Sequence, residues 1–257
     1  MVTNRKLEVW APWLTFAAIV IVWQLIVTGF GVSPFIFPGP WAIATSLVAF
    51  AGPIGQHAWR TFWTTMVGFG LGVVIGLLLG FVIGSSRFVY KSLYPLLVGF
   101  NSIPKSAFVP LLVVWFGIGT VPAILTAFLI CFFPVVVNVA TGLVTLEPEL
   151  EDVLRALGAK RTDVIFKVGL PRSLPYFFAS LKVAITLAFV GAVVSETVAA
   201  NEGIGYLMMS AGSSMRMPLV FAGLVVISVM AMVMYETFAL LERRMTGWAT
   251  RGMNADT

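Results

Sequence analysis

The chain of 257 residues is 59% hydrophobic and only 11% charged, with 16 Lys and Arg against 11 Asp and Glu. Soluble domains are about 45 to 50% apolar and about 25% charged, so this composition excludes a water-soluble protein and predicts one membrane domain over residues 1–257. The lone Cys131 and the lone His57 exclude a disulfide framework and a His/Cys metal site. The net charge of +5 is interpreted as topology information, not as a surface for nucleic acid.

Six apolar stretches are long enough to cross a bilayer core, which takes about 20 residues in a helix. They are predicted at residues 11–30, 61–84, 95–116, 121–143, 176–198 and 218–241, which makes the fold all-α and polytopic. The first is interpreted as a retained anchor because its apolar stretch is too long for a signal peptide and no clear cleavage site follows. The third must begin near Pro95 and contain Lys105, because only eleven residues separate Lys105 from Gly117.

The second predicted span carries a glycine at every fourth position. These are Gly68, Gly72, Gly76, Gly80 and Gly84. Such a face lets two helix backbones approach closely in lipid, so we expect this helix to be buried among its neighbours. In the fourth span, Pro134 predicts a kink.

The distribution of positive charge predicts the orientation. With the N-terminus inside, twelve of the sixteen Lys and Arg residues fall on the inner side and two, Arg60 and Arg216, on the outer side. Lys105 and Lys182 remain within the membrane. This asymmetry satisfies the positive-inside rule, so both termini are expected in the cytoplasm.

Two segments are predicted on the outer side. Residues 31–57 indicate either a short interfacial helix with Trp41 at the headgroup level, which could dock an external partner, or a loop resting on the membrane. Residues 199–217 indicate a turn or a partial re-entry at the outer mouth.

The inner loop at residues 147–171 is the most informative segment. Its apolar residues Leu150, Val153, Leu154 and Leu157 are spaced as one face of a helix, and Gly158 follows where a left-handed cap is expected. A second short helix can begin at Thr162 and must stop before Pro171. The loop is therefore predicted to be a helix, a glycine turn and another helix.

This loop resembles that of the membrane subunits of ATP-binding cassette (ABC) importers, whose motif is Glu-Ala-Ala, three residues, Gly, nine residues, Ile-x-Leu-Pro. Here Asp152-Val153-Leu154 stands at the first three positions, Gly158 follows after three residues, and Val168-Gly169-Leu170-Pro171 follows after nine more. The departures are Asp for Glu and the bulkier Val and Leu for Ala. Residues 103–119, 195–205 and 241–248 are similar to the sulfonate, taurine and nitrate branch of these permeases.

The resemblance implies a homodimer of six-helix subunits in a bacterial inner membrane, two cytoplasmic ATPase subunits and an external solute-binding protein. A short amphipathic helix also suits a groove on a partner. The residues expected to couple the chain to the ATPase are Glu151, Asp152, Leu154, Arg155, Leu157, Gly158, Ala159, Lys160, Arg161, Leu170 and Pro171. No glycine precedes a lysine, so the chain has no phosphate-binding P-loop. We therefore expect no catalysis and no cofactor in this chain, with ATP and Mg bound by the partner ATPase.

Polar residues inside the predicted spans are candidates for the translocation path, because a charge at mid-bilayer costs about 2.5 to 3.5 kcal/mol. These candidates are Asn101, Ser102, Lys105, Asn138 and Glu196. Lys105 either faces solute in a wet cavity or pairs with a carboxylate or caps backbone groups. Glu196 either belongs to an outer gate or a cation site or occupies an exposed helix end.

Two further polar residues are given structural interpretations. Asn138 is expected to form hydrogen bonds across helices, and Lys182 is expected to extend its stem toward the headgroups.

The preferred function is the permease subunit of an ATP-driven importer. The family resemblance implies a small organic anion or zwitterion such as a sulfonate, with nitrate, a pyrimidine precursor or an aromatic acid as alternatives. Specificity in such systems resides largely in the external binding protein. The alternative is a secondary transporter or channel that works without nucleotide. It predicts midplane acidic residues or inverted repeats, and neither is evident in the sequence.

Overall fold

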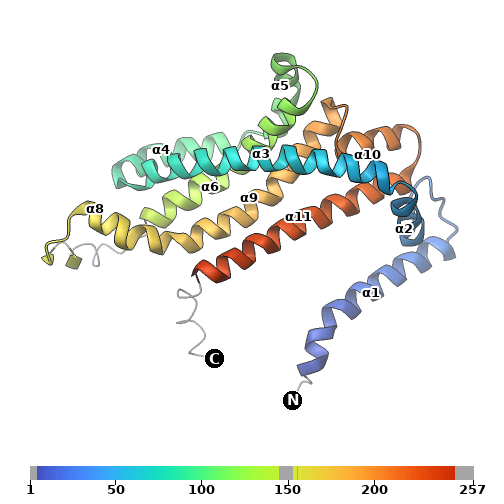
Figure 1. The fold of residues 1–257 in the computed structure, drawn as a ribbon, viewed down its shortest axis with the longest axis horizontal. Helices are drawn as coiled ribbons and strands as arrows, with labels where there is room; N and C mark the ends of the chain where they lie inside the picture. The colour runs from blue at the N-terminus through green and yellow to red at the C-terminus, as the bar shows by residue number, and fades with distance from the viewer. Residues whose placement is uncertain (1–4, 145–152, 155, 247–257) are drawn as a thin grey trace.

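A computed structural model describes residues 5–144, 153–154 and 156–246, and all regular secondary structure in those ranges is helical (Figure 1). The α-helices are α1 (Arg5–Gly29), α2 (Pro40–Ala49), α3 (Ala51–Gly84), α4 (Arg87–Asn101), α5 (Val109–Phe116), α6 (Thr120–Val144), α8 (Arg161–Val164), α9 (Leu170–Ala199), α10 (Ile204–Ser213) and α11 (Met217–Thr246). Within these ranges, five helices are long and apolar enough to cross a membrane, or six if α4 and the segment Lys105–Phe116 form one broken span. The predicted all-α, polytopic fold class is confirmed.

The core lies between α3, α6 and α9, which run side by side along the bundle (Figure 1). The five glycines of α3 are buried, and the atoms that would meet an added Cβ belong to α6. A Cβ on Gly68 would lie 2.6 Å from the carbonyl oxygen of Ile124, and one on Gly80 would lie 2.9 Å from that of Val136. The predicted burial of the glycine face is therefore confirmed, and its partner is α6.

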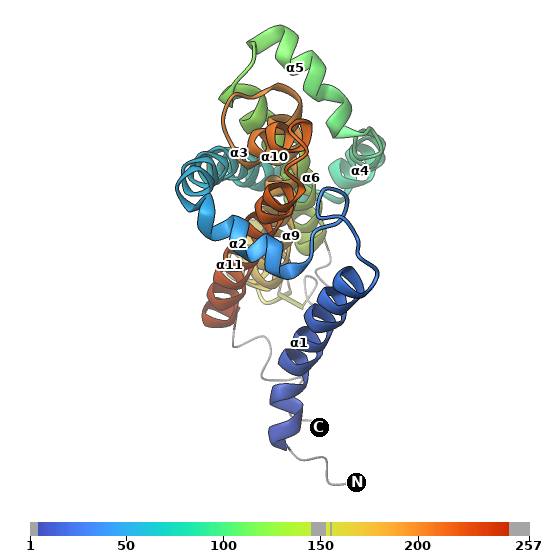
Figure 2. The ribbon, with the colours of Figure 1, turned by 90° about the vertical axis from the view of Figure 1, so that its right-hand side faces the viewer.

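A second apolar cluster lies at one end of the bundle, where α2, α10, α11 and the start of α3 meet. The short helix predicted in residues 31–57 is α2, and the predicted turn at 199–217 contains α10. The backbone N–H of Trp41 donates to Oε1 of Gln24 at 3.0 Å, which joins α2 to α1. Figure 2 shows the rest of α1 leaning away from the bundle. Only 6% of the most apolar stretch of this helix is buried inside the single chain.

The third predicted span, residues 95–116, is not one helix. The structure has α4, a short 3-10 helix at Lys105–Phe108, and α5, with the two halves bent by 71°. Pro104 explains the break, because proline lacks an N–H and disfavours helical geometry in the residue before it. Pro110 lies in the first turn of α5, where proline is tolerated.

Other boundaries also differ from the predictions. The helices α3 and α9 begin at Ala51 and Leu170, well before the predicted residues 61 and 176. The helix predicted to stop before Pro171 instead continues from α8 through a π turn at Ile165–Gly169 into α9. Proline is compatible with this path because it falls in the first turn of α9, next to the widened π turn.

Adding one methyl group to the glycine face tests its role. Gly68→Ala places a Cβ against the Ile124 carbonyl, so the free energy of unfolding should fall by about 1 to 3 kcal/mol. Thermal unfolding in detergent measures the loss. Gly70→Ala is the matched control on the same helix, because no atom lies within 4 Å of its added Cβ. Equal stability of the two variants would contradict the close contact.

Candidate functional site

The described part of the inner loop contains the predicted glycine turn. Gly158 has a φ of +84°, in the left-handed region. The N–H of Leu157 donates to the Val153 carbonyl at 3.1 Å, and the N–H of Ala159 donates to the Leu154 carbonyl at 3.0 Å. The second bond spans five residues, which is the pattern of a Schellman cap.

The second helix of the loop is fixed at its start by a carboxylate. The α8 helix begins at Arg161, one residue before the predicted start, and the N–H of Lys160 donates to Oδ2 of Asp163 at 3.3 Å. Asp163 also pairs with Lys167 at 2.8 Å. The hydrogen bond from Lys167 lowers the pKa of Asp163, so its side chain is a carboxylate at neutral pH. Asp163 therefore connects the residue before α8 to Lys167 in the following turn.

Between the two halves of the loop lies a cavity of about 280 Å³. Leu154, Leu157, Gly158 and Ala159 line it together with Val164, and the Leu157 side chain is 79% exposed. The expected coupling residues Glu151, Asp152 and Arg155 lie outside the described residues, as does the side chain of Arg161. Leu170 and Pro171 are the first two residues of α9.

Three of the candidate path residues lie together at the end of α4. The Lys105 ammonium group donates to the Asn101 carbonyl, and to Oδ1 of Asn101 at 2.7 Å. The Ser102 hydroxyl donates to the Val98 carbonyl at 3.1 Å. Of the interpretations of Lys105, the structure shows the one in which it caps backbone groups. A role for these residues in the solute path stays a prediction.

Two other polar residues form bonds near the bundle core. Asn138 donates to the Pro134 carbonyl of its own helix at 2.8 Å, and a hydrogen bond to another helix stays a prediction. Lys182 pairs with Glu242 of α11 at 2.5 Å, in a partly buried position, a partner that was not predicted from the sequence. This pair ties α9 to α11.

Glu196 is 3% exposed, so the interpretation as an exposed helix end is wrong. Its Oε2 accepts hydrogen bonds from the Thr61 hydroxyl at 2.8 Å and from the Gly205 N–H at 3.0 Å. The Thr64 hydroxyl lies 3.4 Å from Oε1. Thr61 also accepts the Ile204 N–H at 2.8 Å, so one hydroxyl joins α3 to both Glu196 and the start of α10.

The turn into α10 packs directly on this carboxylate. Gly203 has a φ of +105°, and a Cβ there would collide with the Glu196 carboxyl group. The Gly203 N–H donates to Nδ1 of His57 at 3.1 Å. A Cβ on Gly205 would lie 2.7 Å from that of Glu196. Glycine is thus required at two positions for the turn to lie this close to α9.

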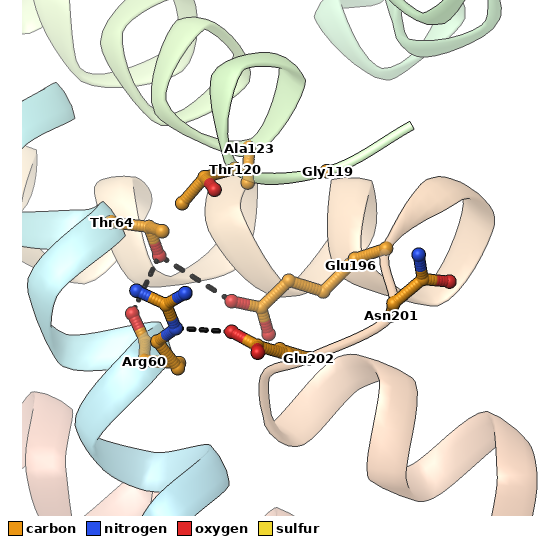
Figure 3. Close-up of a pocket in the computed structure, with 9 residues that line it drawn as sticks. Arg60, Thr64, Gly119, Thr120, Ala123, Glu196, Asn201 and Glu202 are labelled. Atoms are coloured by element: carbon orange, nitrogen blue, oxygen red, sulfur yellow. Dashed lines mark hydrogen bonds and ion pairs between the residues drawn. The ribbon is translucent and has the colours of Figure 1, made fainter. Parts of the chain in front are cut away.

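A polar cavity of about 200 Å³ lies beside Glu196, where α3, the first turn of α6, the end of α9 and the following turn meet (Figure 3). Its polar lining consists of Arg60, Thr64, Thr120, Glu196, Asn201 and Glu202. Arg60 of α3 forms an ion pair with Glu202 of the turn. The Gly119 N–H donates to the Ala199 carbonyl at 3.1 Å, which holds the start of α6 against the end of α9.

Most residues around Glu196 were not identified as site candidates from the sequence. A signal was present in the first half of α3, where polar residues recur at the spacing of one helix face. They are His57, Arg60, Thr61, Thr64 and Thr65. A polar stripe of this kind in an apolar helix predicts a polar partner on a neighbouring helix.

The fold is similar to that of a solved ABC transporter. The chain matches a subunit in an inward-facing conformation of the MetNI methionine ABC transporter with a TM-score of 0.63 and 19% identity, over 77% of this chain and 98% of that one. At this level of identity the similarity concerns the fold, a helical membrane bundle like that of the transporter subunit.

Residues 72–247 match the family of binding-protein-dependent transport system inner membrane components, and the chain belongs to this family. It is 32% identical to the putative aliphatic sulfonates transport permease protein SsuC of Bacillus subtilis, over 95% of this chain and 90% of that protein. It is 30% identical to the taurine transport system permease protein TauC of Escherichia coli, over 91% and 88% respectively.

The predicted function as the membrane permease subunit of an ABC importer is therefore confirmed over the nucleotide-independent alternative. Members of this family are multi-pass inner-membrane transporter subunits. They work with an ATPase and a solute-binding protein.

Removing the shared hydroxyl tests the Glu196 network. Thr61→Val leaves the Ile204 N–H without its acceptor and Glu196 without one donor, so the free energy of unfolding should fall by about 2 kcal/mol. Thermal unfolding of the solubilised protein measures this. Thr237→Val is the control, because the Thr237 hydroxyl donates to the Val233 carbonyl of its own exposed helix turn and, in the described part of the chain, joins no second helix. Similar losses in both variants would argue against the network.

Proposed function

We propose that two copies of this chain form the translocation path for a small organic anion or zwitterion, and that the inner loop couples it to two ATPase subunits, which bind ATP and Mg²⁺. The relatives' names, for aliphatic sulfonates and taurine, support this solute class. The observation that carries the coupling role is the exposed Leu157 beside the capped turn at Gly158. Burying a leucine contributes about 1.5 to 3 kcal/mol, which suits the tip of a helix that enters a partner's groove.

Helical continuity supports transmission from the loop into the membrane. The α8 helix, the π turn and α9 follow one another without a break, and α9 packs in the core against α3 and α6. The Lys182–Glu242 pair extends this connection to α11. Movement of the loop on the ATPase can therefore pass into the bundle as rigid-body motion of α9 and α11.

The proposed orientation has both termini in the cytoplasm. The loop containing α8 and the turn around α10 lie at opposite ends of the bundle (Figure 1). Arg60, paired with Glu202, and Arg216, whose guanidinium lies 6.0 Å from the Phe50 ring, are both near the α10 end. Both are the arginines that the positive-inside rule assigns to the outer side. The polar cavity then faces outward.

A second copy accounts for apolar surface that one copy leaves open. The α5 helix projects from the bundle (Figure 1), and its Val114 and Trp115 side chains are exposed in the single chain. In the proposed dimer, this surface packs against the second copy or lipid. The dimer then presents two inner loops, one to each ATPase subunit.

Changing Leu157 to a charged residue tests the coupling. Leu157→Asp should weaken copurification with the ATPase by at least about tenfold, because the lost burial is worth about 1.5 to 3 kcal/mol. Solute-stimulated ATP hydrolysis and uptake should fall with it. These measurements use the chain reconstituted with its ATPase and binding protein. Native mass spectrometry of the purified complex gives the number of copies of each subunit.

A glycine pair provides the matched control. Gly158→Ala and Gly31→Ala each place a side chain in the left-handed region, at φ of +84° and +60°, in otherwise open space. Only the first lies in the loop, so only the first should reduce ATPase capture. ATP-independent uptake, or normal coupling in Leu157→Asp, would contradict the proposal.

A further inference from the structure

The polar cavity has a positive side formed around Arg60. Its Nε donates to Glu202, and within the described residues no hydrogen bond is formed by its two terminal nitrogens. The side chain is 48% exposed and lines the cavity. A guanidinium with free terminal N–H groups binds the paired oxygens of a carboxylate or sulfonate well. Thr120, in the first turn of α6, lies on the same cavity, and the amino end of a helix adds partial positive charge.

Two acidic side chains line the cavity beside Arg60. Glu196 is held by its hydrogen bonds on Oε2, whereas Oε1 receives only the long contact of 3.4 Å from Thr64. Glu202 shares one of its oxygens with Arg60. Figure 3 shows the two carboxyl groups on the same side of the guanidinium. The last turn of α9 adds partial negative charge there.

The balance of charge selects among the solute classes. The lining carries one guanidinium and two carboxyl groups, and Glu202 already balances the charge of Arg60. A simple oxyanion would bring an unbalanced negative charge beside these acidic groups, which is unfavourable at short range. A molecule with both an oxyanion and an ammonium group brings no net charge and has a partner in the lining for each of its groups. The cavity, of about 200 Å³, suits a small molecule of this kind.

We propose that this cavity binds a small zwitterion, with the oxyanion on the terminal nitrogens of Arg60 and the ammonium group near Glu196 and Glu202. The site rests on the proposed function as an importer and adds to it a point of selection within the permease. It holds the solute at the end of the bundle that carries α10. Arg60 exchanges no partner on binding, because its bond to Glu202 uses a different nitrogen.

A cysteine reporter tests the site in the full-length chain. Asn201→Cys places an exposed thiol on the cavity, and the native Cys131 is fully buried and gives little background. The chain is placed in lipid nanodiscs, and the rate of alkylation by iodoacetamide is measured. A saturating concentration of 2-aminoethanesulfonate should slow alkylation by about tenfold. Ethanesulfonate and ethylammonium, which each carry one of the two charges, should slow it by less than about twofold.

Substitutions of Arg60 and Glu202 test whether binding depends on the charges that line the cavity. Arg60→Met should abolish protection by 2-aminoethanesulfonate. Arg216→Met is the matched control, because Arg216 lies against Phe50 and does not line the cavity, and it should retain protection. Glu202→Gln removes the carboxylate that balances the charge of Arg60, so ethanesulfonate should begin to protect. A Ser214→Cys reporter, exposed beyond the end of α10, should not be protected by any probe.

Two results would overturn the proposal. One is the absence of protection by 2-aminoethanesulfonate, and the other is equal protection by ethanesulfonate in the otherwise unchanged chain. If 2-aminoethanesulfonate gives no protection but Leu157→Asp loses ATPase capture as expected, the binding site is refuted and the proposed function stands. If 2-aminoethanesulfonate protects the thiol but Leu157→Asp couples normally to the ATPase, the coupling role is refuted and the binding site stands.

Discussion

The close approach of α3 and α6 is the constraint on which the structure depends. Five glycines bring the two backbones so near that a Cβ at any of those positions would crowd α6. In lipid, where burial of apolar surface does not drive helices together, such contact supplies dispersion energy that larger residues would prevent. The α9 helix then packs against the pair to complete the core.

This contact also fixes the polar groups at one end of the bundle. Because α3 lies against α6 with little freedom to slide, Thr61 and Thr64 reach Glu196, and Arg60 lies beside the first turn of α6. The buried carboxylate is satisfied by donors from α3 and α10 together. Hydrogen bonds from two helices to one buried side chain favour a single arrangement of those helices.

Features set by local pattern could be predicted from the sequence, whereas those set by distant partners could not. Apolar length revealed the helices, the four-residue glycine period revealed the packed face of α3, and the spacing around Gly158 revealed the capped turn. The burial of Glu196 depends on Thr61, 135 residues earlier. The pairing of Lys182 depends on Glu242, 60 residues later. Neither is visible until the helices are placed.

Prolines account for two of the errors in helix boundaries, because the same residue acts differently in different positions. Pro104 divides the third predicted span, while Pro171 lies within the first turn of a continuous helix and Pro134 lies inside α6. The outcome depends on whether neighbouring turns can widen or end without leaving unpaired backbone groups. That choice is made by tertiary packing.

The α9 helix lies close to α6 near both of its ends. A Cβ on Gly191 would lie 2.8 Å from the Ala127 backbone, and a Cβ on Gly142 of α6 would lie 3.1 Å from the Cβ of Ser173 on α9. With 30 residues, α9 is about 45 Å long, so the two helices touch at well-separated points along most of that length. Two helices held in this way resist bending against each other. A displacement applied at the π turn would therefore reach the end that carries Glu196 with little loss along the helix.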